Sequence, residues 1–191
     1  MKRAGKPATY GLETFRDVLE KLEWEQNGLK ALSEQEPRDP KELYYRAFNA
    51  AVTAWHLADW VWKDMTRDQR QQLETDWKTK LGIDDDGVGN FRHALRKKSR
   101  ELAICREIAT ASKHVEITQG RDESIDTVAS ATTFSLHNSD GEQIQENGMF
   151  VTATKWKLKV EDDGNRREFV EVLHAAFNFW DKFINDRGIG K

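Results

Sequence analysis

The spacing of hydrophobic residues predicts that roughly the first 110 residues of this chain are helical. A first helix is expected at about 12–32, where the apolar positions recur at helical intervals and share one face: Leu12, Phe15, Leu19, Leu22 and Leu29. A weaker amphipathic helix is expected at about 67–81. The segments "FRHALRKKS" and "RELAICREIATASKH" then predict two short helices or one bent helix, with Ser99 as the cap of the second.

The strongest predicted helix is "PKELYYRAFNAAVTAWHLADWVWKDM". Asp39 is expected to cap it, with Pro40 at the first helical position. One stripe of this helix repeats at about 100° per residue: Tyr44, Ala47, Ala51, Trp55, Ala58 and Trp62. Four small residues would let a neighbouring helix approach closely: Ala47, Ala51, Ala54 and Ala58.

The periodicity changes after residue 114. The runs "TVASATTFSL" and "MFVTATKWKLKVE" are rich in β-branched and aromatic residues, and the second alternates apolar residues with lysine, as a half-exposed strand does. The sequences "HNSDGEQ" and "EDDGNRR" are typical of turns. A last amphipathic helix follows and is expected to end at Gly188.

Together these elements predict a mainly α fold, an antiparallel helical bundle with a β-hairpin or small antiparallel sheet inserted before the C-terminal helix (α+β). The 191 residues suit a single domain, 1–191. The bundle is expected to comprise 10–114 and 166–187, and the β insertion about 115–161.

Composition narrows the function classes. Seven Trp and nine Phe supply a core, so wholesale disorder is excluded, and no apolar run is long enough to span a membrane. Cys105 is the only cysteine, which excludes an intramolecular disulfide and is typical of a cytoplasmic protein. No glycine-rich phosphate loop or dinucleotide fingerprint is present, and no cofactor is expected. Because the net charge is −3, polyanion binding would require a local patch.

The first candidate site is a ridge of polar residues. It lies near the end of the helix that is predicted just before the strands. Arg106, Thr110 and His114 follow one another at intervals of four, with Glu107 beside them. We expect the ridge to face away from the core, towards water, a partner chain or a ligand. The simpler interpretation is a solvated face, with a histidine near the negative end of the helix dipole.

A second cluster lies on the long helix. Asn49, His56 and Asp59 are expected on or beside the face opposite the alanines, with His56 and Asp59 one turn apart. An aspartate that orients a histidine occurs in acid–base and metal sites, but a structural hydrogen bond between helices is the favoured interpretation. A metal site would need His56, Asp59 and His114 to converge, with His174. The usual helical metal motifs are absent, so no metal is predicted.

The segment "RHALRKKSR" is a candidate nucleic-acid surface. It places five cations immediately before the polar ridge: Arg92, Arg96, Lys97, Lys98 and Arg100. A phosphate backbone would be attracted to such a patch. Neutralisation by acidic residues in three dimensions is the alternative.

A helical bundle of this size, with an arginine and a histidine on one late helix, resembles the HEPN superfamily. The family's signature is an arginine, often followed by a polar residue, and then a histidine after about four to six positions. Here Arg106 is followed by Glu107, and seven residues separate Arg106 from His114. The resemblance covers the helical part of the chain and does not explain the strands.

The resemblance implies a homodimer and metal-independent cleavage of RNA, as in toxin and phage-defence systems. Arg106 would stabilise the charge on the phosphorane, and His114 would act as the base or acid. On one helix the two lie about 12 Å apart along the axis, so Arg106 of one chain would meet His114 of the other across a two-fold axis. The competing hypothesis is a non-catalytic interaction module, a partner subunit of such a system, in which exposed Trp residues contact a protein.

Overall fold

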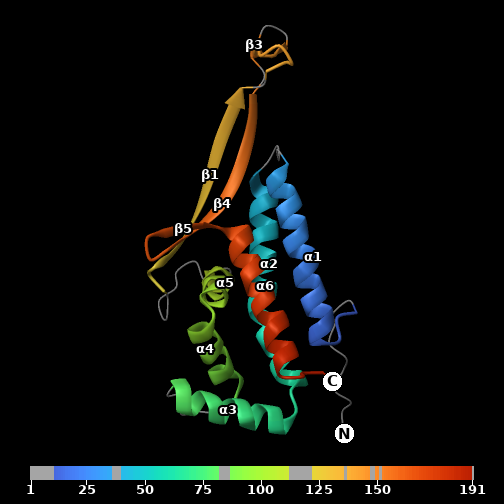
Figure 1. Ribbon diagram of the computed structural model, residues 1–191, viewed down its shortest axis with the longest axis vertical. Helices are drawn as coiled ribbons and strands as arrows, with labels where there is room; N and C mark the ends of the chain where they lie inside the picture. The colour runs from blue at the N-terminus through green and yellow to red at the C-terminus, as the bar shows by residue number, and fades with distance from the viewer. Residues whose placement is uncertain are drawn as a thin grey trace.

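The computed structural model describes residues 11–35, 40–81, 87–111, 122–135, 137–146, 149–150 and 152–190. Within these ranges the chain forms a helical bundle with a small antiparallel sheet, which confirms the predicted fold class (Figure 1). The helices are α1 (Phe15–Glu34), α2 (Pro40–Asp64), α3 (Arg67–Leu81), α4 (Val88–Lys98), α5 (Arg100–Ala111) and α6 (Phe169–Asp186). None of them combines the length and apolar character needed to cross a membrane.

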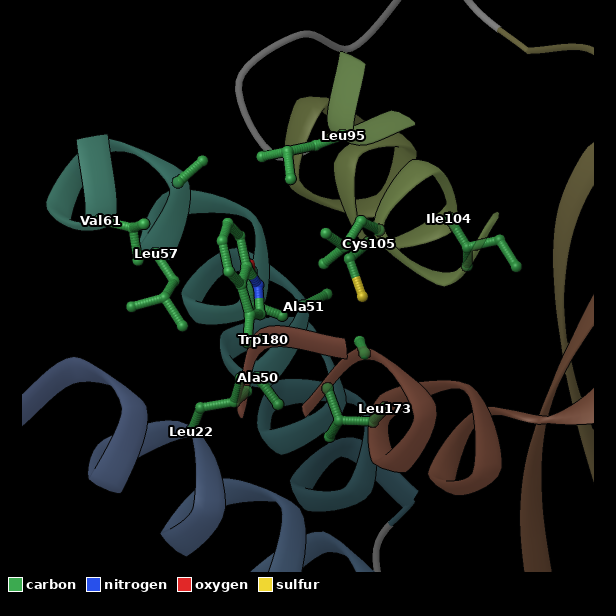
Figure 2. Packing of buried hydrophobic residues seen from close by; sticks show 14 of the residues in the cluster. Leu22, Ala50, Ala51, Leu57, Val61, Leu95, Ile104, Cys105, Leu173 and Trp180 are labelled. Carbon is green, nitrogen blue, oxygen red and sulfur yellow. The ribbon is translucent and has the colours of Figure 1, made fainter. Parts of the chain in front are cut away.

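Helix α2 is the central element of the bundle, and it packs against α1, α5 and α6. Ala51, Leu57 and Trp180 lie in the core that these helices share (Figure 2). Ala50, Ala51, Ala54 and Ala58 are fully buried, as close helix packing requires. The indole Nε1 of Trp180 donates a 2.9 Å hydrogen bond to the carbonyl of Ala54, which fixes α6 against α2.

The buried arc of α2 differs from the predicted stripe. Tyr44, Trp55 and Trp62 are only half-buried, whereas Leu57 and Val61 are fully buried. Because α1, α4, α5 and α6 all contact α2, its buried arc is wider than the predicted stripe.

The helix ends follow from local capping chemistry. The Thr14 hydroxyl and the Asp17 carboxylate form a capping box at the start of α1. Ser99 separates α4 from α5, and its Oγ accepts a 3.2 Å hydrogen bond from the backbone N–H of Leu102. The predicted pair of short helices and the cap at Ser99 are both confirmed. Gly188, at φ +58°, follows the end of α6 as predicted, whereas Asp39 lies outside the described residues.

The main sheet has the strand order β1 (Ile125–Ser135), β4 (Thr152–Asp162), β5 (Asn165–Glu168). A tight turn with positive φ at Asp163 and Gly164 joins β4 to β5. The strands therefore extend beyond the predicted boundary near residue 161, because this turn returns the chain to the sheet before α6 begins. Two short strands, β2 (Gln145–Glu146) and β3 (Met149–Phe150), lie beyond the far end of the β1–β4 ribbon, which projects past the helices (Figure 1).

Candidate functional site

The polar ridge of α5 is not a solvated face. The Arg106 guanidinium forms an ion pair with the Glu107 carboxylate, and only 16% and 9% of these two side chains are exposed. The Thr110 hydroxyl donates a 2.8 Å hydrogen bond to the carbonyl of Arg106, within the helix. Helix α5 contacts α2, α4 and α6, so little of its surface reaches solvent. The ridge was expected to face away from the core, towards water, a partner chain or a ligand, and for Arg106 and Glu107 the prediction of a solvated position is wrong. His114 lies outside the described residues.

A second guanidinium lies close to Arg106. Burial lowers the pKa of Arg96 on α4, the positive charge of Arg106 lowers it further, and Glu107 and Asp122 partly oppose the shift. Arg96 makes no hydrogen bond or ion pair with any other described residue. Arg96 and Arg106 are thus partly desolvated near each other, with Glu107 and Asp122 only partly offsetting the effect on Arg96, and an additional anion would be favourable there.

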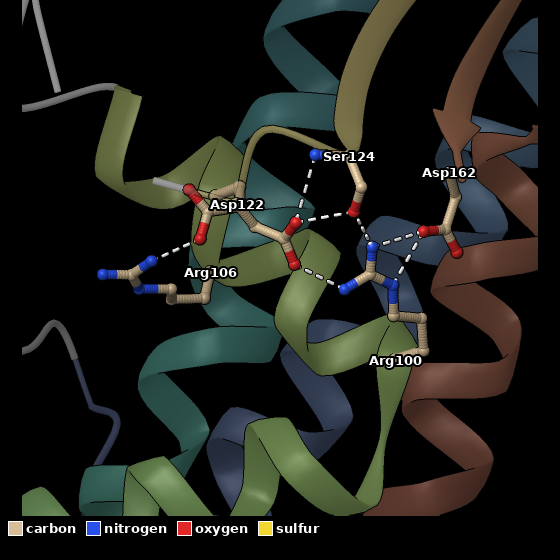
Figure 3. A network of polar contacts seen from close by, with 6 residues as sticks. Arg100, Arg106, Asp122, Ser124 and Asp162 are labelled. Atoms are coloured by element: carbon tan, nitrogen blue, oxygen red, sulfur yellow. Dashed lines mark hydrogen bonds and ion pairs between the residues drawn. The ribbon is translucent and has the colours of Figure 1, made fainter. Parts of the chain in front are cut away.

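Arg100, the last cation of the basic segment, has a structural role. Its Nε donates a 2.7 Å hydrogen bond to Asp162 at the end of β4, and its other nitrogens bind Asp122 and Ser124 (Figure 3). The hydrogen bond with Asp162 is the largest of the interactions that raise the pKa of Arg100. Hydrogen bonds from Ser124 and then from Arg100 lower the pKa of Asp122. This network, Arg100 with Asp122, Ser124 and Asp162, joins the start of α5 to the sheet.

The other predicted cations are also partly engaged. Arg92 forms an ion pair with Asp59 of α2, so an acidic residue does neutralise this part of the segment. The ammonium of Lys98 lies 5.9 Å from the centre of the Trp77 ring, and Lys97 is exposed. The structure thus separates the five cations: carboxylates hold Arg92 and Arg100, and Lys98 lies against Trp77.

The residues of the second predicted cluster differ in their contacts and in their exposure to solvent. Asp59 is bound by Arg92, His56 is half-buried, and Asn49 is exposed. The pairing of His56 with Asp59 stays a prediction. His174 on α6 shares a 3.0 Å hydrogen bond with the amide of Gln26 on α1. In the described part of the chain, no three His, Cys, Asp or Glu side chains lie close enough together to hold a metal ion.

Sequence reasoning did not single out a hollow on the outer face of α1 and α2. Trp24 and Tyr45 are 68% and 65% exposed, and both line this hollow of about 300 Å³. Its other lining residues are Glu25, Glu42, Arg46 and Asn49. The signal was available, because Trp24 stands in "KLEWEQN", outside the apolar stripe of its helix.

A largely apolar cavity of about 280 Å³ separates the sheet from the helices. Its walls include Phe48 from α2, Ile108 from α5, Leu158 from β4 and Phe169 from α6. The described lining also includes Tyr44 and Lys159 but no carboxylate or histidine, so the cavity suits packing or an apolar ligand rather than hydrolysis.

Comparisons with protein-family models, with curated proteins and with solved structures found no match. The chemistry of the described side chains is therefore the basis for assigning a function.

Proposed function

We propose that the protein binds RNA, with a backbone phosphate held between Arg96 of α4 and Arg106 of α5. The observation that carries this proposal is a partly buried Arg96 near a second guanidinium: burial first, and then the charge of Arg106, lowers the pKa of Arg96. Glu107 forms an ion pair with Arg106, and Asp122, which is held by Arg100, opposes only part of the shift at Arg96. A phosphate would accept charge-assisted hydrogen bonds from Arg96.

An exposed lysine next to this pair extends the positive surface. Lys97 follows Arg96 at the end of α4 and is exposed, whereas Lys98 lies about 200° from Arg96 around the helix, over the Trp77 ring. RNA whose phosphate occupies the arginine pair would pass near Lys97. This arrangement favours contact with the backbone, so the proposed binding is insensitive to base sequence.

Fluorescence anisotropy with a labelled single-stranded RNA tests the binding. We expect Arg96→Gln to weaken binding at least about tenfold, since a hydrogen bond to a charged group is worth roughly 1.5–3 kcal/mol. The slope of log K against log salt should fall by about one. Lys182→Gln is the matched control, because Lys182 is an exposed cation on α6. Equal effects of the two substitutions would refute a phosphate site at Arg96.

Cleavage of the bound RNA is a separate part of the proposal, and it follows the HEPN-like hypothesis. Arg106 would stabilise the charge that develops on the phosphorane, and His114 would transfer the proton. The assay is RNA cleavage in EDTA. His114→Ala and Arg106→Ala should each lower the rate by about 10² to 10⁴. Restored activity on mixing the two variants would support a composite site. If the wild type binds RNA but does not cleave it, only this part of the proposal fails.

The second candidate is a non-catalytic interaction module, and the exposed pair Trp24 and Tyr45 favours it. Exposed aromatic residues that share one hollow are typical of binding hot spots. A photo-crosslinking residue at position 45 should capture a defined partner in cells, and Trp24→Ala should abolish the product. The same crosslinker at the exposed Gln72 of α3 is the control. The purified partner should then form a stable complex with the wild type and none with Trp24→Ala.

A further inference from the structure

Strand β1 exposes an open edge. All 11 of its residues, from Ile125 to Ser135, pair with β4, and no described strand lies on its other side. The far half of the β1–β4 ribbon projects past the helices (Figure 1), whereas the near half faces them across the apolar cavity. Among the described residues, no strand pairs with the outward-pointing backbone N–H and C=O groups between Thr127 and Thr132, so this stretch can accept another strand.

The sequence of β1 lacks the features that usually protect an edge. Charged residues and proline are absent from Thr127 to Ser135. The register with β4 is continuous, so no bulge turns the edge away. Most of the side chains are small and exposed, including Ala129, Ala131 and Thr133. An uncharged, regular edge of this length is favourable for strand addition.

The opposite edge of the ribbon differs in charge. Strand β5 pairs with β4 only from Lys159 to Asp162, and no other described strand pairs with that side of β4 from Thr152 to Leu158. That segment contains Lys155 and Lys157, the latter in an ion pair with Glu168 of β5, and lysine on an edge strand disfavours pairing with another chain. The contrast singles out β1 as the edge that can accept a strand.

We propose that β1 pairs with β1 of a second copy of this chain, antiparallel and across a two-fold axis. The order of the joined sheet would be β5-β4-β1-β1-β4-β5. Identical strands that pair in this way need a centre without like charges, and β1 meets this condition because its only charge, Asp126, stands near one end. A two-stranded ribbon is marginally stable in water, and two more strands would stabilise it. This inference is independent of RNA binding.

Size-exclusion chromatography with light scattering tests the proposal on the full chain over a concentration series. The wild type should reach twice the 22.1 kDa mass of one chain. Ala131→Lys should shift the protein to the monomer, because it introduces a charge near its symmetry mate at the middle of the edge. Ala131→Thr is the matched control and should remain dimeric, since threonine is uncharged and favours strands. A monomeric wild type, or a dimeric Ala131→Lys variant, would overturn the proposal.

Cysteine crosslinking is a second test of the β1–β1 interface, for the case in which the Ala131→Lys variant does not fold. Single cysteines at Ala129, Ala131 and Thr133 should give disulfide-linked dimers on mild oxidation, most strongly at the position nearest the two-fold axis. The native Cys105 is buried and should not interfere. A cysteine at Gln72, exposed on α3, should not crosslink. If none of the three β1 positions crosslinks faster than position 72, β1 is not the interface.

Discussion

Replacing Arg100 by methionine should destabilise the fold, because Arg100 joins α5 to the sheet. Methionine keeps the unbranched chain and removes the guanidinium. The substitution leaves Asp122, Ser124 and Asp162 without the donor group that all three share. The sequence had suggested a nucleic-acid contact for Arg100, so this variant separates a structural role from a binding role.

The expected size follows from how far these groups are buried. Exposed ion pairs contribute up to about 1 kcal/mol, whereas removing one partner of a fully buried pair costs about 3–5 kcal/mol. Arg100 and Asp122 are each 34% exposed and Asp162 is 12% exposed, so the network lies between these limits. We expect a loss of about 2 kcal/mol in the free energy of unfolding, which corresponds to roughly 4–8 °C in Tm for a chain of this length.

The effect should depend on pH in a defined direction. The pKa of Asp122 is lowered in the folded protein, so its contribution is complete above the unfolded aspartate pKa of about 3.9. That contribution is lost as the pH falls through the folded pKa. The stability difference between wild type and Arg100→Met should therefore be largest near neutral pH and narrow below about pH 4.

Urea unfolding followed by circular dichroism measures this difference, with Lys182→Met as the control for loss of an exposed cation. Unchanged stability in Arg100→Met, together with weaker RNA binding, would refute the structural role. A stability difference that grows in acid would refute the assignment to Asp122.

Three further predictions concern the core and a helix cap. Ala51→Leu should lower stability by about 1–3 kcal/mol, measured by urea unfolding, because Ala51 is fully buried where α2 meets its neighbours; an unchanged midpoint would contradict close packing there. Ser99→Ala should cost about 1 kcal/mol in the same measurement, through loss of the α5 cap, whereas Ser33→Ala, on the exposed end of α1, should cost much less. Burial raises the pKa of the Cys105 thiol to about 12, so native protein should react with a thiol reagent far more slowly than unfolded protein; equal rates would show that the site opens readily.

The local elements of this fold were predictable from the sequence. Helical spacing of apolar residues predicted α1, α2 and α3. A proline marked the start of α2, and a serine marked the break between α4 and α5. The alternation of apolar residues with lysine predicted β4, and Gly188 marked the end of α6. These signals act over a few residues, because periodicity and capping depend on neighbours within one or two turns.

The surroundings of the charged residues depended on the tertiary structure. Arg92 and Arg100 belong to one basic segment in the sequence, yet each binds carboxylates from other elements, Asp59 on α2 and Asp162 on β4. No helical wheel contains these partners, since they lie far away along the chain. Likewise, a wheel places Arg106 and Glu107 on the polar side of α5, but both side chains are largely buried in the folded protein. Sequence periodicity determined where the helices and strands form, whereas long-range packing decided which charges are neutralised, which arginine is left beside Arg106, and which strand edge stays open.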